Sequence, residues 1–146
     1  MASRRSYTWS SVRLSICGTY LDPVEVTEAL GIEPDDSAKK GDLWGPAHDR
    51  ICKQGVWSLI GRPSTSRIET QMADILKRLG PSRTRLRRFI RENKHVQEAS
   101  VDIGYTPRED LAIACFTLKS ALVKEYVSLG VDIEISFYLP LQYMDK

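Results

Sequence analysis

The chain is poor in several features that would identify whole classes of protein. Its three cysteines, Cys17, Cys52 and Cys115, are an odd number, widely spaced and without a Cys-x-x-Cys pair, so neither a disulfide framework nor a zinc module is predicted. The longest apolar runs are far too short to span a bilayer. No apolar segment follows Arg4 and Arg5, so no secretory signal is predicted. These absences favour a cytosolic protein that has no membrane partner.

Length and composition predict one globular domain. The 146 residues are 42% hydrophobic and 27% charged, which is ordinary for a folded domain and predicts a single domain, 1–146, with an ordered core over about 7–140. The net charge of +2 argues against a general polyanion binder, but the charge is unevenly distributed. Eight basic residues and one acidic residue fall within 77–94, so this span carries +7 and the remainder of the chain −5.

The amino-terminal half alternates strand and helix patterns. A strand is predicted over 7–18, where apolar and polar residues alternate. Asp22 is placed to cap a short helix that ends before Gly31. Residues 34–52 contain mostly turn and solvent residues and predict a long irregular connection, whereas 56–60 predict a second strand.

Two consecutive helices are predicted in the middle of the chain. The first is capped by 63–66, halts at Gly80-Pro81, and places five apolar residues on one stripe, namely Ile68, Met72, Ile75, Leu76 and Leu79. The second continues from Pro81, and its apolar side is formed by Leu86, Phe89 and Ile90. Both apolar sides are expected to pack against a sheet.

The remaining segments predict three strands and a helix. Strands are expected at 101–105 and 111–117, and a helix over 119–129. The clearest alternation in the chain predicts a final strand over 131–139. Its apolar residues should be buried and its polar residues exposed, respectively Ile133, Ile135 and Phe137, and Asp132, Glu134 and Ser136.

The order of these elements predicts an α+β fold. We expect a mainly antiparallel sheet of about five strands with helices packed on one face. A weak internal echo supports two halves of similar build, because Leu30-Gly31-Ile32-Glu33 matches Leu129-Gly130-Val131-Asp132 in residue type. The sequence therefore favours ferredoxin-like, pseudo-symmetric strand-helix halves.

Several segments also carry a family resemblance. They are Leu21-Asp22-Pro23, Leu30-Gly31-Ile32-Glu33-Pro34, Lys39-Lys40-Gly41-Asp42 and Gly55-Val56-Trp57-Ser58-Leu59. In this order they resemble a bacterial family known as domain of unknown function 4279, and the resemblance extends over most of the chain, roughly from Val12 to Tyr138. The family has no assigned activity, so the resemblance implies none.

The Lys-Gly-Asp turn and the long loop after it form one candidate binding region. The loop could border a cleft beside the sheet, and its candidate residues are Tyr20, Lys40, Asp42, Trp44 and Trp57. The alternative is architectural, since Asp42 could brace the loop, Lys40 could pair with a carboxylate, and Trp57 could belong to the core.

The arginine-rich helix is a second candidate. Its face could follow phosphates and so bind nucleic acid or another polyanion, through Arg83, Arg87, Arg88 and Arg91. The alternative is a solvated helix face.

A small enzyme that uses Cys52 as its nucleophile is the third possibility. His48 lies four residues before Cys52, but neither an oxyanion-hole pattern nor an orienting partner accompanies them. Paired carboxylates occur at Asp35-Asp36, at Glu109-Asp110, and at Asp132 with Glu134. Asp132 and Glu134 share one polar strand face, so they could form a hydrolytic or cation-binding pair, although charges on a solvated face are the commoner explanation.

The function predicted from these patterns is binding without catalysis. We expect no catalytic residue, cofactor or metal, and a partner that is another protein, with nucleic acid as the alternative. The sequence does not indicate whether the chain forms oligomers.

Overall fold

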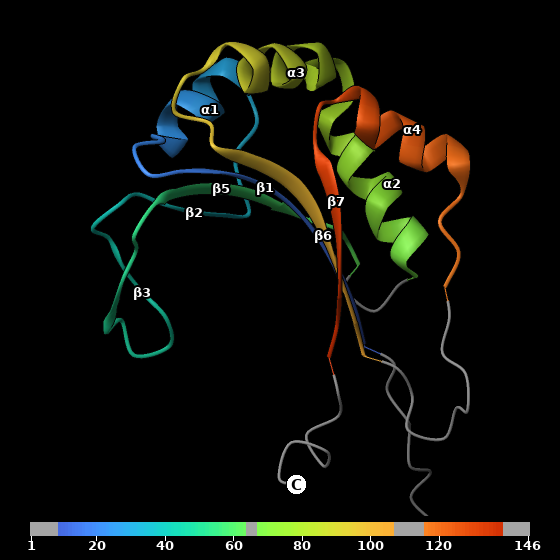
Figure 1. Ribbon diagram of the computed structural model, residues 1–146, viewed down its shortest axis with the longest axis horizontal. Helices are drawn as coiled ribbons and strands as arrows, with labels where there is room; N and C mark the ends of the chain where they lie inside the picture. Colours follow the sequence, from blue (N-terminus) through green and yellow to red (C-terminus); the bar gives the residue numbers. More distant parts are fainter. Residues whose placement is uncertain (1–8, 64–66, 107–115, 139–146) are drawn as a thin grey trace, which may run out of the picture.

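A curved sheet carries the described helices on its convex side (Figure 1). The computed structural model describes residues 9–63, 67–106 and 116–138. The five strands of the sheet lie in the order β2-β5-β1-β6-β7, and every neighbouring pair is antiparallel except β6 and β7. Their bounds are β1 (Trp9–Gly18), β2 (Asp36–Ala38), β5 (Gly55–Ile60), β6 (Glu98–Thr106) and β7 (Asp132–Phe137).

The helices and a small hairpin complete the described part of the chain. The helices are α1 (Pro23–Leu30), α2 (Ile68–Leu79), α3 (Arg83–Glu92) and α4 (Ser120–Ser128), with a 3-10 turn, η1 (Gly80–Ser82), between α2 and α3. Two short strands, β3 (Leu43–Trp44) and β4 (Arg50–Ile51), pair only with each other. The α+β class and the mainly antiparallel sheet of five strands are thus confirmed.

Local signals explain where the first helix begins and ends. The Asp22 carboxylate accepts a hydrogen bond from the N–H of Val24 at 3.0 Å, and Pro23 occupies the first turn. Gly31 ends the helix with φ 68°, a conformation that glycine adopts without a steric penalty.

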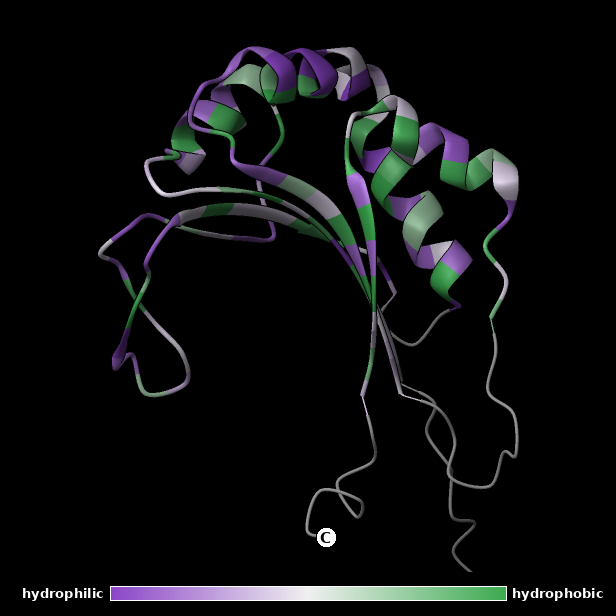
Figure 2. Cartoon of the chain, viewed as in Figure 1, coloured by the Kyte–Doolittle hydropathy of each residue, from purple (hydrophilic) through white to green (hydrophobic). Residues whose placement is uncertain are grey.

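The core lies between the sheet and the helices. Hydrophobic and hydrophilic residues alternate along β6 and β7 (Figure 2), and all five residues of the predicted stripe on α2 are buried. Buried hydrogen bonds also fix how these elements are positioned against one another. The Gln71 side chain accepts a hydrogen bond from the N–H of Val12 at 3.0 Å, and the Tyr126 hydroxyl donates one to the carbonyl of Met72 at 2.7 Å. These contacts fix α2 to β1 and α4 to α2.

The prediction for the connection over 34–52 needs correction. Residues 34–52 are not an irregular connection throughout, because they contain β2, β3 and β4. Strands of two or three residues are too short to produce a recognisable period. The predicted cap at 63–66 falls mostly outside the described residues, and Arg67 precedes α2 without a capping side-chain hydrogen bond.

The predicted strand at 111–117 also falls mostly outside the described residues. Phe116 and Thr117 are described and lie outside any strand. Because this strand would belong to one of the two expected halves, the ferredoxin-like pseudo-symmetry is not confirmed. The two Leu-Gly pairs do share one role, since Gly31 and Gly130 both have positive φ and both lead toward an edge strand.

The burial predicted for the last strand is wrong for two of its three apolar residues. Asp132–Phe137 is a strand, and its polar residues are exposed as expected. However, Ile133 is only partly buried, and Ile135 and Phe137 are exposed by 44% and 63%. These side chains are exposed because β7 is an edge strand and continues beyond the ends of the helices in Figure 1. Alternation indicates which residues share a face and leaves open whether that face is covered.

Candidate functional site

None of the described helices lies on the concave side of the sheet, which forms a groove with the β3–β4 hairpin. This groove has a volume of about 990 Å³. Its floor comes from β1, β2 and β5, through Arg13, Asp36, Ala38 and Val56, and its wall is the hairpin. Figure 1 shows the hairpin hanging from the end of the sheet, away from the helices.

The predicted Lys-Gly-Asp turn anchors the base of this hairpin. The N–H of Gly41 donates to the carbonyl of Cys52, and the N–H of Cys52 donates to the carbonyl of Asp42, both at 2.8 Å. The Asp42 carboxylate accepts a hydrogen bond from the N–H of Lys39 at 2.8 Å. Gly41 has φ 95°, which only glycine adopts readily. These contacts give the turn an architectural role.

The hairpin exposes large apolar side chains toward the groove. Leu43, Trp44 and Ile51 all line it and are exposed by 60%, 50% and 64%. The Arg50 guanidinium lies 5.6 Å from the centroid of the Trp44 ring, a cation–π distance. Contiguous exposed apolar side chains of this size commonly mark a surface that contacts another molecule.

From the groove, a row of polar and mostly small residues runs across the concave face of the sheet. In the sheet register one row crosses every strand, namely Asp36, Ser58, Ser15, Ser100 and Asp132. The hydroxyls of Ser15 and Ser58 are 3.0 Å apart. Side chains converge on the concave side of a bent sheet, so small hydroxyl residues fit there. Beside this row, Arg13 forms an ion pair with Asp36 at 3.1 Å.

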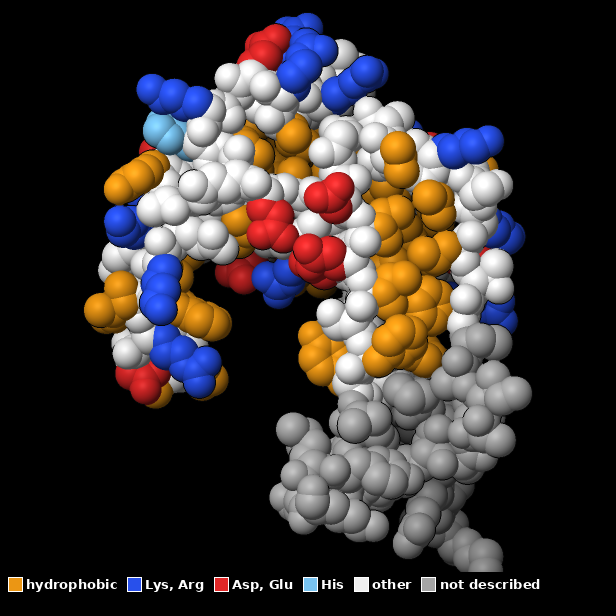
Figure 3. Space-filling view, in the orientation of Figure 1, with side chains coloured by type: hydrophobic (Ala, Val, Ile, Leu, Met, Phe, Trp, Pro, Cys, Tyr) orange, Lys and Arg blue, Asp and Glu red, His pale blue; other side chains and the backbone are white. Residues whose placement is uncertain are grey.

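Four carboxylates lie on the concave face of the sheet, at the end formed by β6 and β7. Figure 3 shows acidic side chains gathered on this concave side. They are Glu98, Asp102, Asp132 and Glu134, here called the acidic cluster. Asp102 lies directly opposite Glu134 in the register. The hydrogen bond and charge of Asp102 raise the pKa of Glu134, and the hydrogen bond and charge of Glu134 raise the pKa of Glu98. None of the four forms an ion pair with another described residue.

The five predicted binding residues are not brought together. Asp42 and Trp44 line the groove. Tyr20 and Lys40 form a separate contact, with the ammonium 4.8 Å from the ring centroid, and Asp22 pairs with Lys39 at 3.3 Å. Trp57 is fully buried, and its indole N–H donates to the Thr27 hydroxyl at 3.1 Å. Trp57 is therefore a core residue, and Lys39 forms the ion pair that Lys40 was expected to form.

Sequence reasoning missed several other residues of the groove. Leu43 and Ile51 face each other in the hairpin, and Arg13 comes from the polar side of β1. The only sequence signal was that apolar residues flank the charged turn and loop. The alternation in 7–18 did identify the open face, because it placed Arg13 and Ser15 together.

The two residues suggested for nucleophilic catalysis lie in the same groove. His48 and Cys52 both line the groove, but no hydrogen bond joins them. Within residues 9–63, 67–106 and 116–138, no group of three or more His, Cys, Asp or Glu side chains could hold a metal ion. The pair Glu109-Asp110 lies outside the described residues.

Two of the four predicted arginines on α3 have structural partners. Arg83 donates hydrogen bonds to the carbonyl of Leu76 and pairs with Glu125 at 3.2 Å, and Arg91 pairs with Glu92 at 3.3 Å. Arg87 and Arg88 are exposed and form no ion pair with a described residue.

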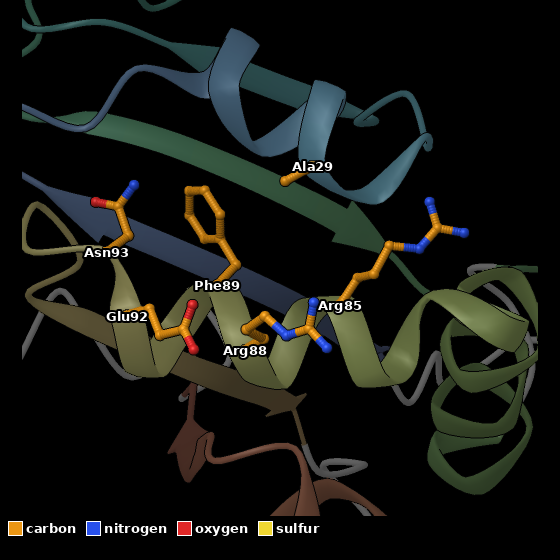
Figure 4. A pocket seen from close by; sticks show the side chains of 6 residues that line it. All are labelled: Ala29, Arg85, Arg88, Phe89, Glu92 and Asn93. Atoms are coloured by element: carbon orange, nitrogen blue, oxygen red, sulfur yellow. The ribbon is translucent and has the colours of Figure 1, made fainter.

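A shallow depression of about 360 Å³ lies between α1 and α3. Arg85 and Arg88 border it, with Phe89 at its centre (Figure 4). Glu92 also lines this depression, so one carboxylate accompanies its two guanidinium groups. The predicted arginine face is thus smaller than the sequence suggested.

The fold and the groove define an α+β domain with one covered and one open sheet face. A family described as "Domain of unknown function (DUF4279)" matches residues 6–140, and the chain belongs to this family. Searches of the curated proteins and of the solved structures find no match to the chain. None of the helices in the described part of the chain has the length and apolar character needed to cross a bilayer.

Proposed function

We propose that this protein is a non-catalytic binding module of a bacterial cytosolic protein, and that it takes a segment of another protein into the groove. The observation that supports this most is the group formed by Leu43, Trp44 and Ile51, three large side chains that are each at least half exposed and line one wall. Burying such side chains against a partner removes roughly 25 cal/mol of unfavourable free energy per Å² of apolar surface.

The groove has the chemistry of a site for a segment that is both apolar and acidic. Apolar side chains of the partner would contact the hairpin wall. Acidic side chains of the partner would form ion pairs with Arg50 and Lys53. These two residues also line the groove and form no ion pair with a described residue. The hairpin is anchored at its base by the Lys39–Asp42 turn, so the wall is held in place before a partner arrives, which lowers the entropic cost of binding.

Site-specific photo-crosslinking in cells of the source organism would test this proposal. A photoreactive amino acid at position 43 should produce a discrete protein adduct, whereas the same group at Val24 should not. Val24 is a matched control, because it is 53% exposed and lies on α1, on the convex side of the sheet. Trp44→Ala should then reduce the yield of the adduct at position 43. Equal adducts at both positions, or none at position 43, would contradict the proposal.

A second candidate is polyanion binding through the depression between α1 and α3. The observation that favours it is that Arg85 and Arg88 line the depression together with Phe89 (Figure 4), an arrangement that could hold phosphates beside an aromatic ring. Binding of a single-stranded DNA oligonucleotide should then weaken steeply with salt. Replacing Arg85 and Arg88 by Glu should reduce the slope of log affinity against log salt by up to about two phosphate contacts.

A further inference from the structure

The β7 strand presents an edge that no described strand covers. It lies last in the sheet order and pairs with β6 alone. Its six residues contain no proline, and its two charged residues are both acidic, so they disfavour pairing with an acidic strand and not with a basic one. In a strand, alternate backbone N–H and C=O groups point to opposite sides. Those directed away from β6 are available to a further strand.

One side of this edge is apolar. Ile135 and Phe137 are exposed, and the ring of Phe137 lies 6.1 Å from that of Tyr105 and 6.3 Å from that of Phe116. Figure 3 shows hydrophobic side chains gathered in a broad surface between β7 and α4. A strand added to β7 would place every second side chain over this surface.

The opposite side of the same edge is acidic. The acidic cluster places Asp132 and Glu134 on β7 and two more carboxylates on β6. The nearest basic residue in the register is Arg13, which lies opposite Asp102 but forms its ion pair with Asp36 at 3.1 Å. The negative charge on this side is therefore left for a partner to neutralise.

We propose that the β7 edge binds an extended segment of a partner protein in which lysine or arginine residues alternate with apolar residues. The segment would add a sixth strand to the sheet. Its backbone would pair with β7, its basic side chains would lie over the acidic cluster, and its apolar side chains would contact Ile135 and Phe137. Strand addition of this kind obtains affinity from main-chain hydrogen bonds and specificity from alternate side chains.

The charge pattern distinguishes this occupant from a second copy of the chain. Antiparallel pairing of two β7 strands would bring Asp132 and Glu134 of one copy against the same acidic residues of the other. Like charges placed opposite each other across two strands are destabilising. The surface also shares no lining residue with the groove, so the two proposals can fail independently.

A synthetic peptide tests the proposal directly. The probe is a blocked heptapeptide of alternating lysine and valine, and its binding to the full chain is measured by calorimetry. It should bind, whereas the same peptide with glutamate in place of lysine should not. The double variant Asp132→Asn with Glu134→Gln should weaken binding by roughly fivefold. Glu28→Gln, an exposed acidic position on α1, is the control and should leave affinity unchanged.

Backbone pairing has its own test, which separates strand addition from simple charge attraction. Two further probes carry N-methyl groups at either the odd or the even residues, because each set removes the donors on one side of the strand only. One of the two should lose binding and the other should retain it. Equal binding of both methylated probes, or binding of the glutamate peptide, would overturn the proposal. So would a dimer in sedimentation equilibrium that competes with the lysine probe, since it would assign the edge to a second copy.

Discussion

The Arg78 guanidinium donates a hydrogen bond to the Asp35 carboxylate at 2.7 Å and so fastens α2 to the segment between α1 and β2. The same carboxylate accepts hydrogen bonds from Arg62 and, at 2.7 Å, from the N–H of Ile60. Burial by itself would raise the pKa of Asp35. The Ile60 N–H and the two arginines outweigh it, so the pKa lies below its ordinary value of 3.8. This contact therefore holds the edge of the sheet to the helical layer.

Asp35→Asn should reduce the free energy of unfolding by about 1 to 3 kcal/mol at neutral pH, because it removes a charge-assisted network. A carboxyl whose folded pKa is lowered stabilises the fold above its ordinary pKa, and the contribution disappears as pH falls through the folded value. The difference between wild type and variant should therefore shrink below pH 3.8. Urea denaturation at several pH values measures it. The exposed neighbouring pair Arg13–Asp36 is the control, and Asp36→Asn should cost less than about 1 kcal/mol.

Tyr126→Phe should destabilise the protein by about 1 to 2 kcal/mol, because the carbonyl of Met72 would lose a buried hydrogen bond. Tyr126 is fully buried, and its hydroxyl is the contact that fixes α4 to α2. Tyr20, by contrast, is 68% exposed, so Tyr20→Phe should leave the melting temperature unchanged. Equal melting temperatures for all three proteins would show that the hydroxyl of Tyr126 does not hold the helix.

Gly55→Ala should cost about 3 kcal/mol or more, because a Cβ at this position would lie 1.9 Å from the carbonyl oxygen of Leu21 and the backbone would have to move. Gly41→Ala meets no atom within 4 Å but must adopt φ 95°, which costs about 1 to 2 kcal/mol. Chemical denaturation should therefore rank Gly55→Ala as the more damaging variant. The reverse order would mean that the approach of Leu21 to β5 is looser than the structure shows.

The difference between these two glycines illustrates what the sequence could predict. Asp22 and Gly31 act through local chemistry, and the apolar stripe of α2 follows the helical period. The sequence predicts all three features correctly. The Gly-x-Trp-Ser-Leu segment was recognisable as a strand. Its glycine is required by a residue distant in the sequence, Leu21, and no local pattern reveals such a contact.

The candidate site was predicted less well, because it depends on tertiary geometry. Residue type alone points to Trp44 and Asp42, and both line the groove. Residue type points equally to Tyr20 and Trp57, yet Tyr20 contacts Lys40 outside the groove and Trp57 is in the core. The groove exists because the sheet bends away from its helices and a short hairpin projects from its end, and neither feature has a sequence period.

Ile103 and Ile135 offer a matched test of the finding that the apolar face of β7 is partly exposed. They lie opposite each other in adjacent strands, but Ile103 is fully buried and Ile135 is 44% exposed. Ile103→Asp should therefore abolish folding, since it would bury an unpaired charge. Ile135→Asp should leave a cooperative fold, with a loss of about 1 to 2 kcal/mol. Circular dichroism during thermal unfolding distinguishes the two, and an unfolded Ile135→Asp variant would mean that this face of β7 is covered.

Glu134→Gln should stabilise the protein at neutral pH, because Glu134 lies between the carboxyls of Asp102 and Glu98. Its hydrogen bond and repulsion with Asp102 raise its pKa above the ordinary value of 4.5, and Glu134 in turn raises that of Glu98. When the folded pKa is raised, the folded state binds more protons than the unfolded state. Stability is then fully present below pH 4.5 and is lost as pH rises through the folded values.

The groups facing Glu134 are Glu98 and Asp102 from β6, Asp132 from its own strand and Arg13 from β1. Because the glutamine cannot ionise, the variant should lose less stability than the wild type between about pH 4.5 and 7. The effect of Asp35 lies at lower pH and has the opposite sign, so it does not mask this window. Thermal unfolding across the window measures the difference, with Glu28→Gln as control. Identical pH profiles for wild type and Glu134→Gln would mean that the four carboxylates do not repel one another, and the charge argument for a basic partner at the β7 edge would fail with them.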